Sequence, residues 1–152
     1  MIVKFTDNSD EVLSAFEVAC LRGLEKCGLV AEGYAKKLAP VDTGNLRNSI
    51  THNMDSGEPA AFIGTNVEYA VYQEMGTGIY ADGGRPTPWI YTDAKGQTHW
   101  TRGNKAHPFI KPAVADHIQT YKKIIEKELK NGSSTMQYRY CIAFRNNTVN
   151  AR

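Results

Sequence analysis

The stretch VDTGNLRNSI, around Asp42 and Thr43, places a carboxylate, a hydroxyl and a glycine in succession, which are residue types of a nucleophile–base site. Such a site would need a base and a third group that orients it. The nearest histidine, His52, falls on an expected strand with no recognisable signature around it. We therefore interpret the stretch as a turn whose free N–H groups are capped by Asp42 or Thr43. Gly44 would take backbone angles that other residues avoid, and Leu46 would pack inward.

Other residues of chemical interest also favour structural roles. The segment GTGIYADGG suggests a phosphate-binding loop, but it lacks the lysine and the spacing of G-x-x-x-x-G-K-[ST], so we expect a flexible loop. Glu68 and Glu74 are six residues apart and therefore lie on different faces of a helix, which favours surface charge over an acid–base pair. The chain contains no G-x-S-x-G nucleophile motif. The sequence predicts no enzyme.

The three cysteines and four histidines do not form a recognisable metal site. Cys20 and Cys27 would lie about 10.5 Å apart along a helix axis, beyond the reach of a disulfide. The paired spacings C-x-x-C and H-x-x-x-H are absent. We expect buried, unreactive thiols, and we expect His99 and His107 to be packed or to face solvent. The sequence therefore predicts neither a metal nor a cofactor.

Length and composition fit one soluble domain. The 152 residues are 41% hydrophobic and 22% charged, close to the average for globular proteins. No apolar run approaches the roughly 20 residues that a membrane span needs. The N-terminal sequence MIVKFTDNSDEV lacks the features of a secretion signal, which predicts synthesis and residence in a cytoplasm.

A long helix is expected over about residues 10–39, ended by Pro40. Its apolar stripe steps by three or four residues: Leu13, Phe16, Cys20, Leu24, Cys27, Ala31, Tyr34 and Leu38. Gly23, Gly28 and Gly33 lie inside this helix, where each costs about 1 kcal/mol relative to alanine. They either weaken the helix or let another backbone approach closely, through packing or through oligomerisation.

The middle of the chain predicts two hairpins and a short helix. Residues 47–54 and 60–66 are expected strands of the first hairpin. Glu68 to Met75 read as a short helix that Gly76 closes. The segments TPWIYT and QTHWT flank the turn DAKG and predict a second hairpin.

A second long helix is expected from near Pro112 to Asn131 and Gly132, with one apolar face formed by Val114, Ile118, Tyr121, Ile125 and Leu129. Both helices need a common partner for their apolar faces. The predicted fold class is therefore α+β, with a small mixed, mainly antiparallel sheet, the two helices packed against one face of it, and a β-hairpin excursion.

The last 20 residues differ from the rest, because they hold three of the 18 basic residues and none of the 16 acidic ones. We expect one domain over residues 1–132 and a basic extension over residues 133–152. Within the extension, Tyr138, Tyr140, Ile142 and Phe144 alternate with less apolar residues, which predicts an added strand. Such a strand would pair with its own sheet or with that of a neighbouring chain and so support assembly.

The segment over residues 85–111 combines basic and aromatic residues. Its cations are Arg85, Lys95, Arg102, Lys105 and Lys111, its rings are Trp89, Tyr91, Trp100 and Phe109, and its single acid is Asp93. Basic groups interleaved with stacking rings can bind nucleic acid. The alternative, which we favour, is a twisted hairpin whose aromatic residues pack inward and whose lysines lie on its outer face.

Three segments in order resemble a known family: LAPVDTGNLRNSI, IGTNVEYAVYQEMGTG and PTPWIYTDAKGQTHWTRGNKAHPFIKPAV. Over about residues 10–130 the chain is similar to the tail-completion, or head–tail joining, proteins of long-tailed bacteriophages and prophages, often labelled minor tail or neck proteins. The combination that carries the resemblance is A-P-x-D-T-G-x-L, then G-T-x-x-x-Y-A-x-Y-x-E-x-G-T, then P-F-[IL]-[KR]-P-A. Residues 133–152 extend beyond it.

The resemblance implies a non-enzymatic virion protein, made in the bacterial host cytoplasm, that forms a ring at the head-proximal end of the tail. The ring is expected to be a hexamer, and its partners are the head–tail connector and tail-tube proteins; DNA contact is compatible with this role but not required. The rival hypothesis is a nucleic-acid-binding module that uses residues 85–111. The resemblance also assigns architectural roles. The turn into the sheet uses Asp42, Thr43, Gly44 and Leu46; the central block uses Gly64, Thr65, Tyr69, Ala70, Tyr72, Glu74, Gly76 and Thr77; Pro108, Phe109 and Pro112 seat the last helix.

Overall fold

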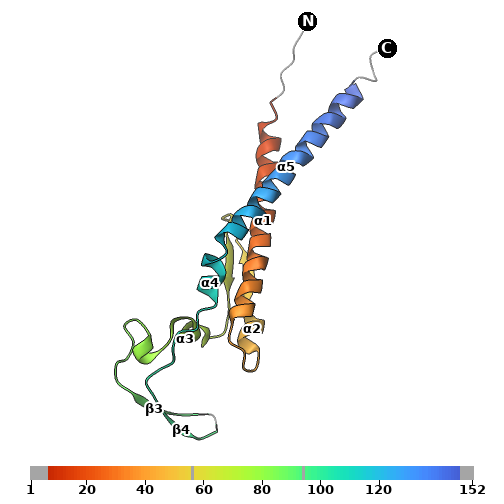
Figure 1. Ribbon diagram of the computed structural model, residues 1–152. Coiled ribbons are helices and arrows are strands. Elements are labelled where there is room, and N and C mark those ends of the chain that lie inside the picture. The colour runs from red at the N-terminus through yellow and green to blue at the C-terminus, as the bar shows by residue number, and fades with distance from the viewer. Residues whose placement is uncertain (1–6, 56, 94, 148–152) are drawn as a thin grey trace. The chain divides into compact units, whose positions relative to one another are not determined.

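The computed structural model describes residues 7–55, 57–93 and 95–147, with side chains described as far as Gly132 (Figure 1). Its elements are α1 (Ser9–Leu38), α2 (Asn45–Ser49), β1 (Thr51–Met54), β2 (Ala61–Gly64), α3 (Ala70–Met75), the 3-10 helix η1 (Gly78–Tyr80), β3 (Trp89–Thr92), β4 (Thr98–Thr101), α4 (Ile110–Ala115) and α5 (Ile118–Asn147). In the part of the chain that is described, no helix is long and apolar enough to cross a membrane.

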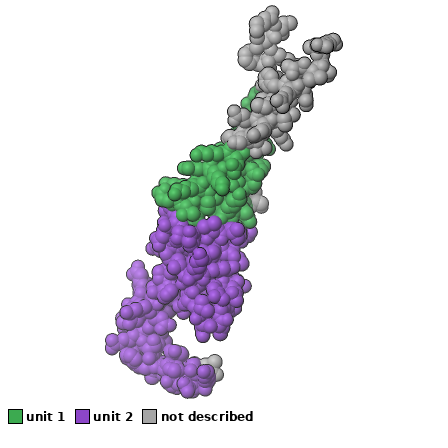
Figure 2. Space-filling view, turned by 45° about the vertical axis from the view of Figure 1, so that its right-hand side comes forward, with its two compact units in different colours: residues 1–28, 54–61, 119–152 green, residues 29–53, 62–118 purple. Residues whose placement is uncertain are grey.

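The chain forms two compact units, which Figure 2 shows in different colours. Unit 1 contains residues 1–28, 54–61 and 119–152, and unit 2 contains residues 29–53 and 62–118. Each unit is therefore assembled from segments that are distant in sequence.

The predicted α+β class is confirmed, but the strands do not form one sheet. β1 pairs with β2, and β3 pairs with β4, in two separate two-stranded sheets. The first hairpin is shorter than expected, because α2 takes up the residues before β1. Helices α3 and η1 lie between the two hairpins in the sequence. The common sheet that we expected is not formed.

Helix α1 matches the predicted long helix, but its buried side differs from the predicted stripe. Leu13, Phe16 and Leu38 are exposed, Leu13 to 59%. The helix instead carries a small residue at every fourth position: Ala15, Ala19, Gly23, Cys27, Ala31, Ala35 and Ala39 at its end. Of these, Ala19 and Ala35 are almost completely buried. Small side chains bury best here because they let neighbouring elements approach the helix backbone closely.

Unit 1 is held together by contacts between the first part of α1 and α5. A Cβ added at Gly23 would lie 2.8 Å from Cδ1 of Ile125 and 3.5 Å from its Cα. Lys26 donates a hydrogen bond of 2.6 Å to the buried carboxylate of Glu128. The thiol of Cys27 lies 3.7 Å from the carbonyl oxygen of Tyr121, and burial raises the pKa of this thiol. Close approach thus explains Gly23, whereas the thiols of Cys20 and Cys27 are half-buried rather than buried as we expected.

Helix α5 corrects two expectations about the C-terminal part of the chain. It does not stop at Gly132 but continues to Asn147, so the predicted strand with Tyr138, Tyr140, Ile142 and Phe144 is wrong. Gly132 lies inside the helix, where an added Cβ would be 3.0 Å from Cβ of Ala19. A helix satisfies its own backbone hydrogen bonds, whereas the alternating pattern needed a sheet edge to pair with.

The two glycines of α1 make a matched test of this packing. We expect Gly23→Leu to destabilise the chain by about 1–3 kcal/mol, because the added atoms would overlap Ile125. Gly33→Leu places the same side chain where no described atom lies within 4 Å of the added Cβ. It should be neutral or stabilising by up to about 1 kcal/mol through helix propensity. Urea unfolding followed by circular dichroism measures both, and equal losses at the two sites would contradict the close approach at Gly23.

Candidate functional site

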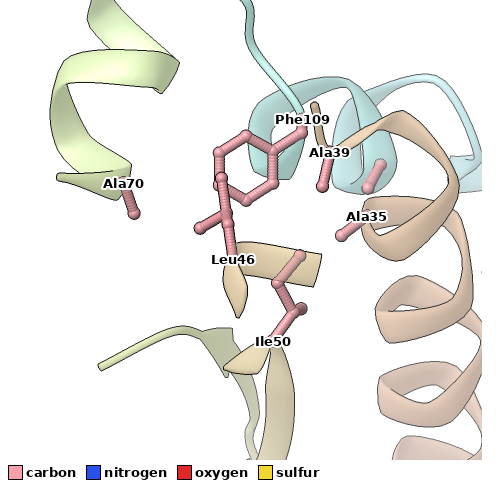
Figure 3. Close-up of a cluster of buried hydrophobic side chains, with 7 residues drawn as sticks. Ala35, Ala39, Leu46, Ile50, Ala70 and Phe109 are labelled. Atoms are coloured by element: carbon pink, nitrogen blue, oxygen red, sulfur yellow. The ribbon is translucent and has the colours of Figure 1, made fainter. Parts of the chain in front are cut away.

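The three sequence motifs meet in the core of unit 2. Phe109 and Ile50 are completely buried there, together with Leu46 and Ala70. Figure 3 shows these side chains gathered with Ala35 and Ala39 of the α1 end around the ring of Phe109. Burial of such a side chain is worth roughly 1.5–3 kcal/mol. The core therefore joins the turn after α1, helix α3 and the start of α4.

Glu74 fixes the start of α4 from the neighbouring helix α3. Its Oε2 accepts the backbone N–H groups of Phe109 at 2.8 Å and Ile110 at 3.0 Å, and its Oε1 accepts that of Lys111 at 2.8 Å. Burial alone would raise the pKa of Glu74, but the three N–H donors outweigh it, and the pKa is lowered. The expectation that Glu74 is a surface charge is therefore wrong. A sequence signal existed, because the helix start HPFIK offers no side chain of its own that can cap.

A second junction lies between residues 73–79 and 102–107. His107 donates its backbone N–H to the Gln73 carbonyl at 2.7 Å, and Ile79 donates to that of Arg102 at 3.0 Å. Between them, Thr77 and Asn104 exchange two hydrogen bonds of 2.9 and 2.8 Å. The first part of the expected flexible loop is therefore fixed by backbone hydrogen bonds.

Glycine is required where these two segments cross. Gly78 and Gly103 have φ angles of 61° and 111°. A Cβ at Gly78 would lie 2.0 Å from the oxygen of Arg102, and one at Gly103 would lie 2.0 Å from the oxygen of Thr77. Gly76, with φ 78°, ends α3 and donates its N–H to the Tyr72 carbonyl, as the sequence predicted for a helix C-terminus.

The stretch around Asp42 has the geometry of a turn. Gly44 has φ 84° at the start of α2, and Leu46 is 3% exposed. Thr43 Oγ1 accepts the Asn45 N–H at a long 3.4 Å. Asp42 is exposed and has no hydrogen bond or ion pair with the described residues. Thr43 thus accepts one N–H of the turn, while α2 itself begins without a side-chain cap.

A groove of about 460 Å³ lies beside this turn. Residues 40–46 form one side of it, and Tyr69 and Gln73 form the other. Val41 and Tyr69 are exposed at the groove, and Asp42 contributes its only carboxylate. The groove thus combines two exposed apolar side chains with polar groups and a negative charge.

The remaining residues of the central block have structural positions. Thr65, just after β2, shares a hydrogen bond of 2.6 Å with Ser49 and accepts the Val67 N–H at 3.2 Å. Gly64 ends β2, and Tyr72 is exposed on α3. Pro108 precedes the Phe109 start of α4, and Pro112 lies within its first turn.

Strand β1 is tied to α1 through Glu32. The Glu32 carboxylate accepts hydrogen bonds from Lys36 at 2.5 Å and from the backbone N–H of His52 at 3.1 Å, and His52 Nδ1 lies 2.5 Å from Oε2. The hydrogen bond from Lys36, followed by that from His52, lowers the pKa of Glu32 to about 2. His52 is thus part of a structural cluster rather than the base of a catalytic pair.

The β3–β4 hairpin does not pack Tyr91 and Trp100 inward, so the interpretation that we favoured is wrong for these two rings, whereas Trp89 is half-buried and Phe109 is buried. Ile90 and Trp100 face each other in the antiparallel register, and they are 66% and 62% exposed. The Arg102 guanidinium lies 5.3 Å from the Trp100 ring centroid. On the opposite face, Tyr91 stacks on His99, whose Nε2 lies 2.9 Å from Asp93. The hairpin therefore presents Tyr91 and Trp100 to its surroundings.

No group of three or more His, Cys, Asp or Glu side chains that could hold a metal occurs among the described residues. The site consists of a junction around Phe109, a groove at Asp42 and an exposed hairpin. These features belong to an α+β fold.

Comparison with protein families agrees with this class. Residues 4–76, just under half of the chain, match the family model described as "Bacteriophage HK97-gp10, putative tail-component". In this segment the chain is similar to the HK97-gp10-like family of phage tail components, which confirms the resemblance found in the sequence. The match includes the first motif and most of the second, and it ends at Gly76. No curated protein and no solved structure matches the chain.

The cap at α4 can be tested with the two glutamates at the ends of the second motif. We expect Glu74→Gln to lower the free energy of unfolding by about 1–3 kcal/mol, because an amide oxygen replaces a carboxylate that accepts three N–H groups. Glu68→Gln, at an exposed position just before α3, should change it by less than about 0.5 kcal/mol. Urea unfolding measures the two values. Equal effects would contradict the capping role of Glu74.

Glu32 predicts a specific loss of stability in acid. Its pKa is about 2 in the folded chain instead of its ordinary 4.5, so its contribution is present above pH 4.5 and is lost as the pH falls toward 2. Glu32→Gln should therefore show a weaker fall in unfolding free energy between about pH 5 and pH 2 than the wild type. Glu17→Gln, at an exposed position of the same helix, should follow the wild-type curve. Parallel curves for Glu32→Gln and wild type would contradict the cluster.

Proposed function

We propose that this protein is a structural subunit of a phage tail, which assembles with its own copies into a ring at the head-proximal end and joins the tail to the head connector. The family match over residues 4–76 supports the tail, and the order of the three motifs supports the head-proximal position. The ring itself is proposed from the resemblance found in the sequence, which implies a hexamer.

The observation that carries the assembly is the amount of apolar side chain left uncovered. Among the described residues, 20 large hydrophobic side chains are exposed, whereas six of the nine buried hydrophobic residues are alanines. A monomer that functions alone seldom exposes so many large apolar groups in clusters. The segment over residues 69–80 is one such cluster, with Tyr69, Val71, Tyr72, Met75, Ile79 and Tyr80 all exposed.

Head–tail joining can be tested in the phage or prophage that carries this gene. Inactivation of the gene should leave DNA-filled heads and separate tails, and expression of the chain from a plasmid should restore joined particles. Electron microscopy of lysates measures the fraction of joined particles. Normally joined, infectious particles in the absence of the gene product would refute the proposed position.

A further inference from the structure

The β3–β4 hairpin lacks a partner for its apolar face within the described chain. Ile90 and Trp100 form a cross-strand pair, and both are exposed to more than 60%. A two-stranded hairpin is at best marginally stable in water unless a further strand or another surface packs on it. The exposed pair therefore needs an external surface.

The base of the hairpin is already ordered. The Thr77–Asn104 and Ile79–Arg102 hydrogen bonds hold its two ends together, and the crossing at Gly78 and Gly103 leaves no room for a side chain. A projecting element that is fixed in advance loses less conformational entropy when it binds. The β3–β4 hairpin is therefore suited to dock on another surface, and we call it the arm.

Its residue types favour a protein over a nucleic acid as the bound surface. Trp100 and Arg102, whose guanidinium lies 5.3 Å from the Trp100 ring, are residue types that are enriched at protein interfaces. Ile90, directly opposite, can neither stack on a base nor pair with a phosphate. Arg85, Lys95, Arg102 and Lys105 form no ion pair with a described carboxylate, so the arm also offers unpaired positive charge.

The groove beside Asp42 has the complementary properties. Val41 and Tyr69 expose 57% and 44% of their surface at it, so the hairpin of the same chain does not cover them. Asp42 adds a carboxylate that has no partner among the described residues. On the hairpin, the apolar pair Ile90 and Trp100 lies beside the cation Arg102. At the groove, the apolar pair Val41 and Tyr69 lies beside the anion Asp42. The two surfaces are therefore complementary in charge and in apolar character.

We infer that the β3–β4 hairpin of one subunit docks in the Asp42–Tyr69 groove of a second copy of this chain, with Ile90 and Trp100 against Val41 and Tyr69 and Arg102 near Asp42. Two different patches of one chain then meet, which is the heterologous type of contact from which rings are built. This inference rests on the proposed function, because it takes the association of like subunits from it.

A mixing experiment separates this contact from its alternatives. Trp100→Ser should weaken self-association of the full chain roughly tenfold or more, and so should Tyr69→Ser at the groove. Mixed together, the two variants should form dimers, because one intact arm can meet one intact groove, but no rings. Ile90→Ser provides a second arm variant, and Val114→Ser, at an exposed position of α4, is the control. Light scattering after gel filtration measures the masses, and circular dichroism checks that each variant is folded.

Charge reversal tests the register of the contact. Arg102→Glu and Asp42→Arg should each weaken association, and an equimolar mixture of the two single variants should recover it, because each arm–groove contact between unlike variants joins opposite charges. The double variant should recover most of the wild-type association. Lys122→Glu, at an exposed position of α5, should leave association unchanged.

The outcomes distinguish this inference from the proposed function. If wild type assembles and the arm variants assemble equally well, the docking is refuted and the ring stands. If the mixed variants stay monomeric, the arm meets another arm or another surface, and the docking is again refuted. If Trp100→Ser loses only affinity for a single-stranded oligonucleotide, the hairpin binds nucleic acid instead. A wild-type chain that stays monomeric at every concentration refutes both proposals.

Discussion

The core of unit 2 depends on the hydrogen bonds that the Glu74 carboxylate accepts from the start of α4. This carboxylate holds the N–H groups of Phe109, Ile110 and Lys111, and so places the Phe109 ring among Leu46, Ile50 and Ala70. Without it, the part-buried N–H groups of Phe109 and Ile110 would have no acceptor, at a cost of roughly 1–3 kcal/mol for each. The Glu74 carboxylate therefore links the second motif to the third. The aromatic ring of Phe109, which it positions, links both motifs to the first. This explains why three segments that are far apart in sequence work as one structural unit.

The use of small residues explains how the chain can be folded and still expose much apolar surface. On α1, alanine and glycine face the packed contacts, and large side chains such as Phe16 lie outside. Tight backbone approach supplies the internal packing, because close-packed small groups leave few voids. The large side chains of residues 69–80 and of the hairpin thus remain available for other surfaces. Small side chains at the internal contacts and large apolar side chains at the surface suit a subunit that buries the large ones when it associates.

Local patterns made part of this structure predictable. The limits of α1, the Gly76 end of α3, the Gly44 turn and the second hairpin each follow from residues that are close in sequence. The cap at Glu74 could not be derived in this way, because its donors begin 35 residues later. The exposure of Trp100 depends on which other segment covers that face of the hairpin. The alternation of apolar and polar residues along the strands does not identify such a segment. The strand expected over residues 136–145 was wrong because a short alternation of apolar residues also fits a helix, in which Tyr140 and Phe144 lie four residues apart.

We propose that the fixed junction around Phe109 presents surfaces that become buried only when copies of the chain associate. Hydrogen exchange with mass spectrometry, on the wild-type chain over a range of concentrations, tests it most directly. The account predicts that amides of residues 109–113 exchange slowly at every concentration, whereas those of residues 89–101 slow down as the mass of the species increases. Fast exchange at residues 109–113 in the isolated chain, or hairpin exchange that does not change while the mass increases, would contradict it.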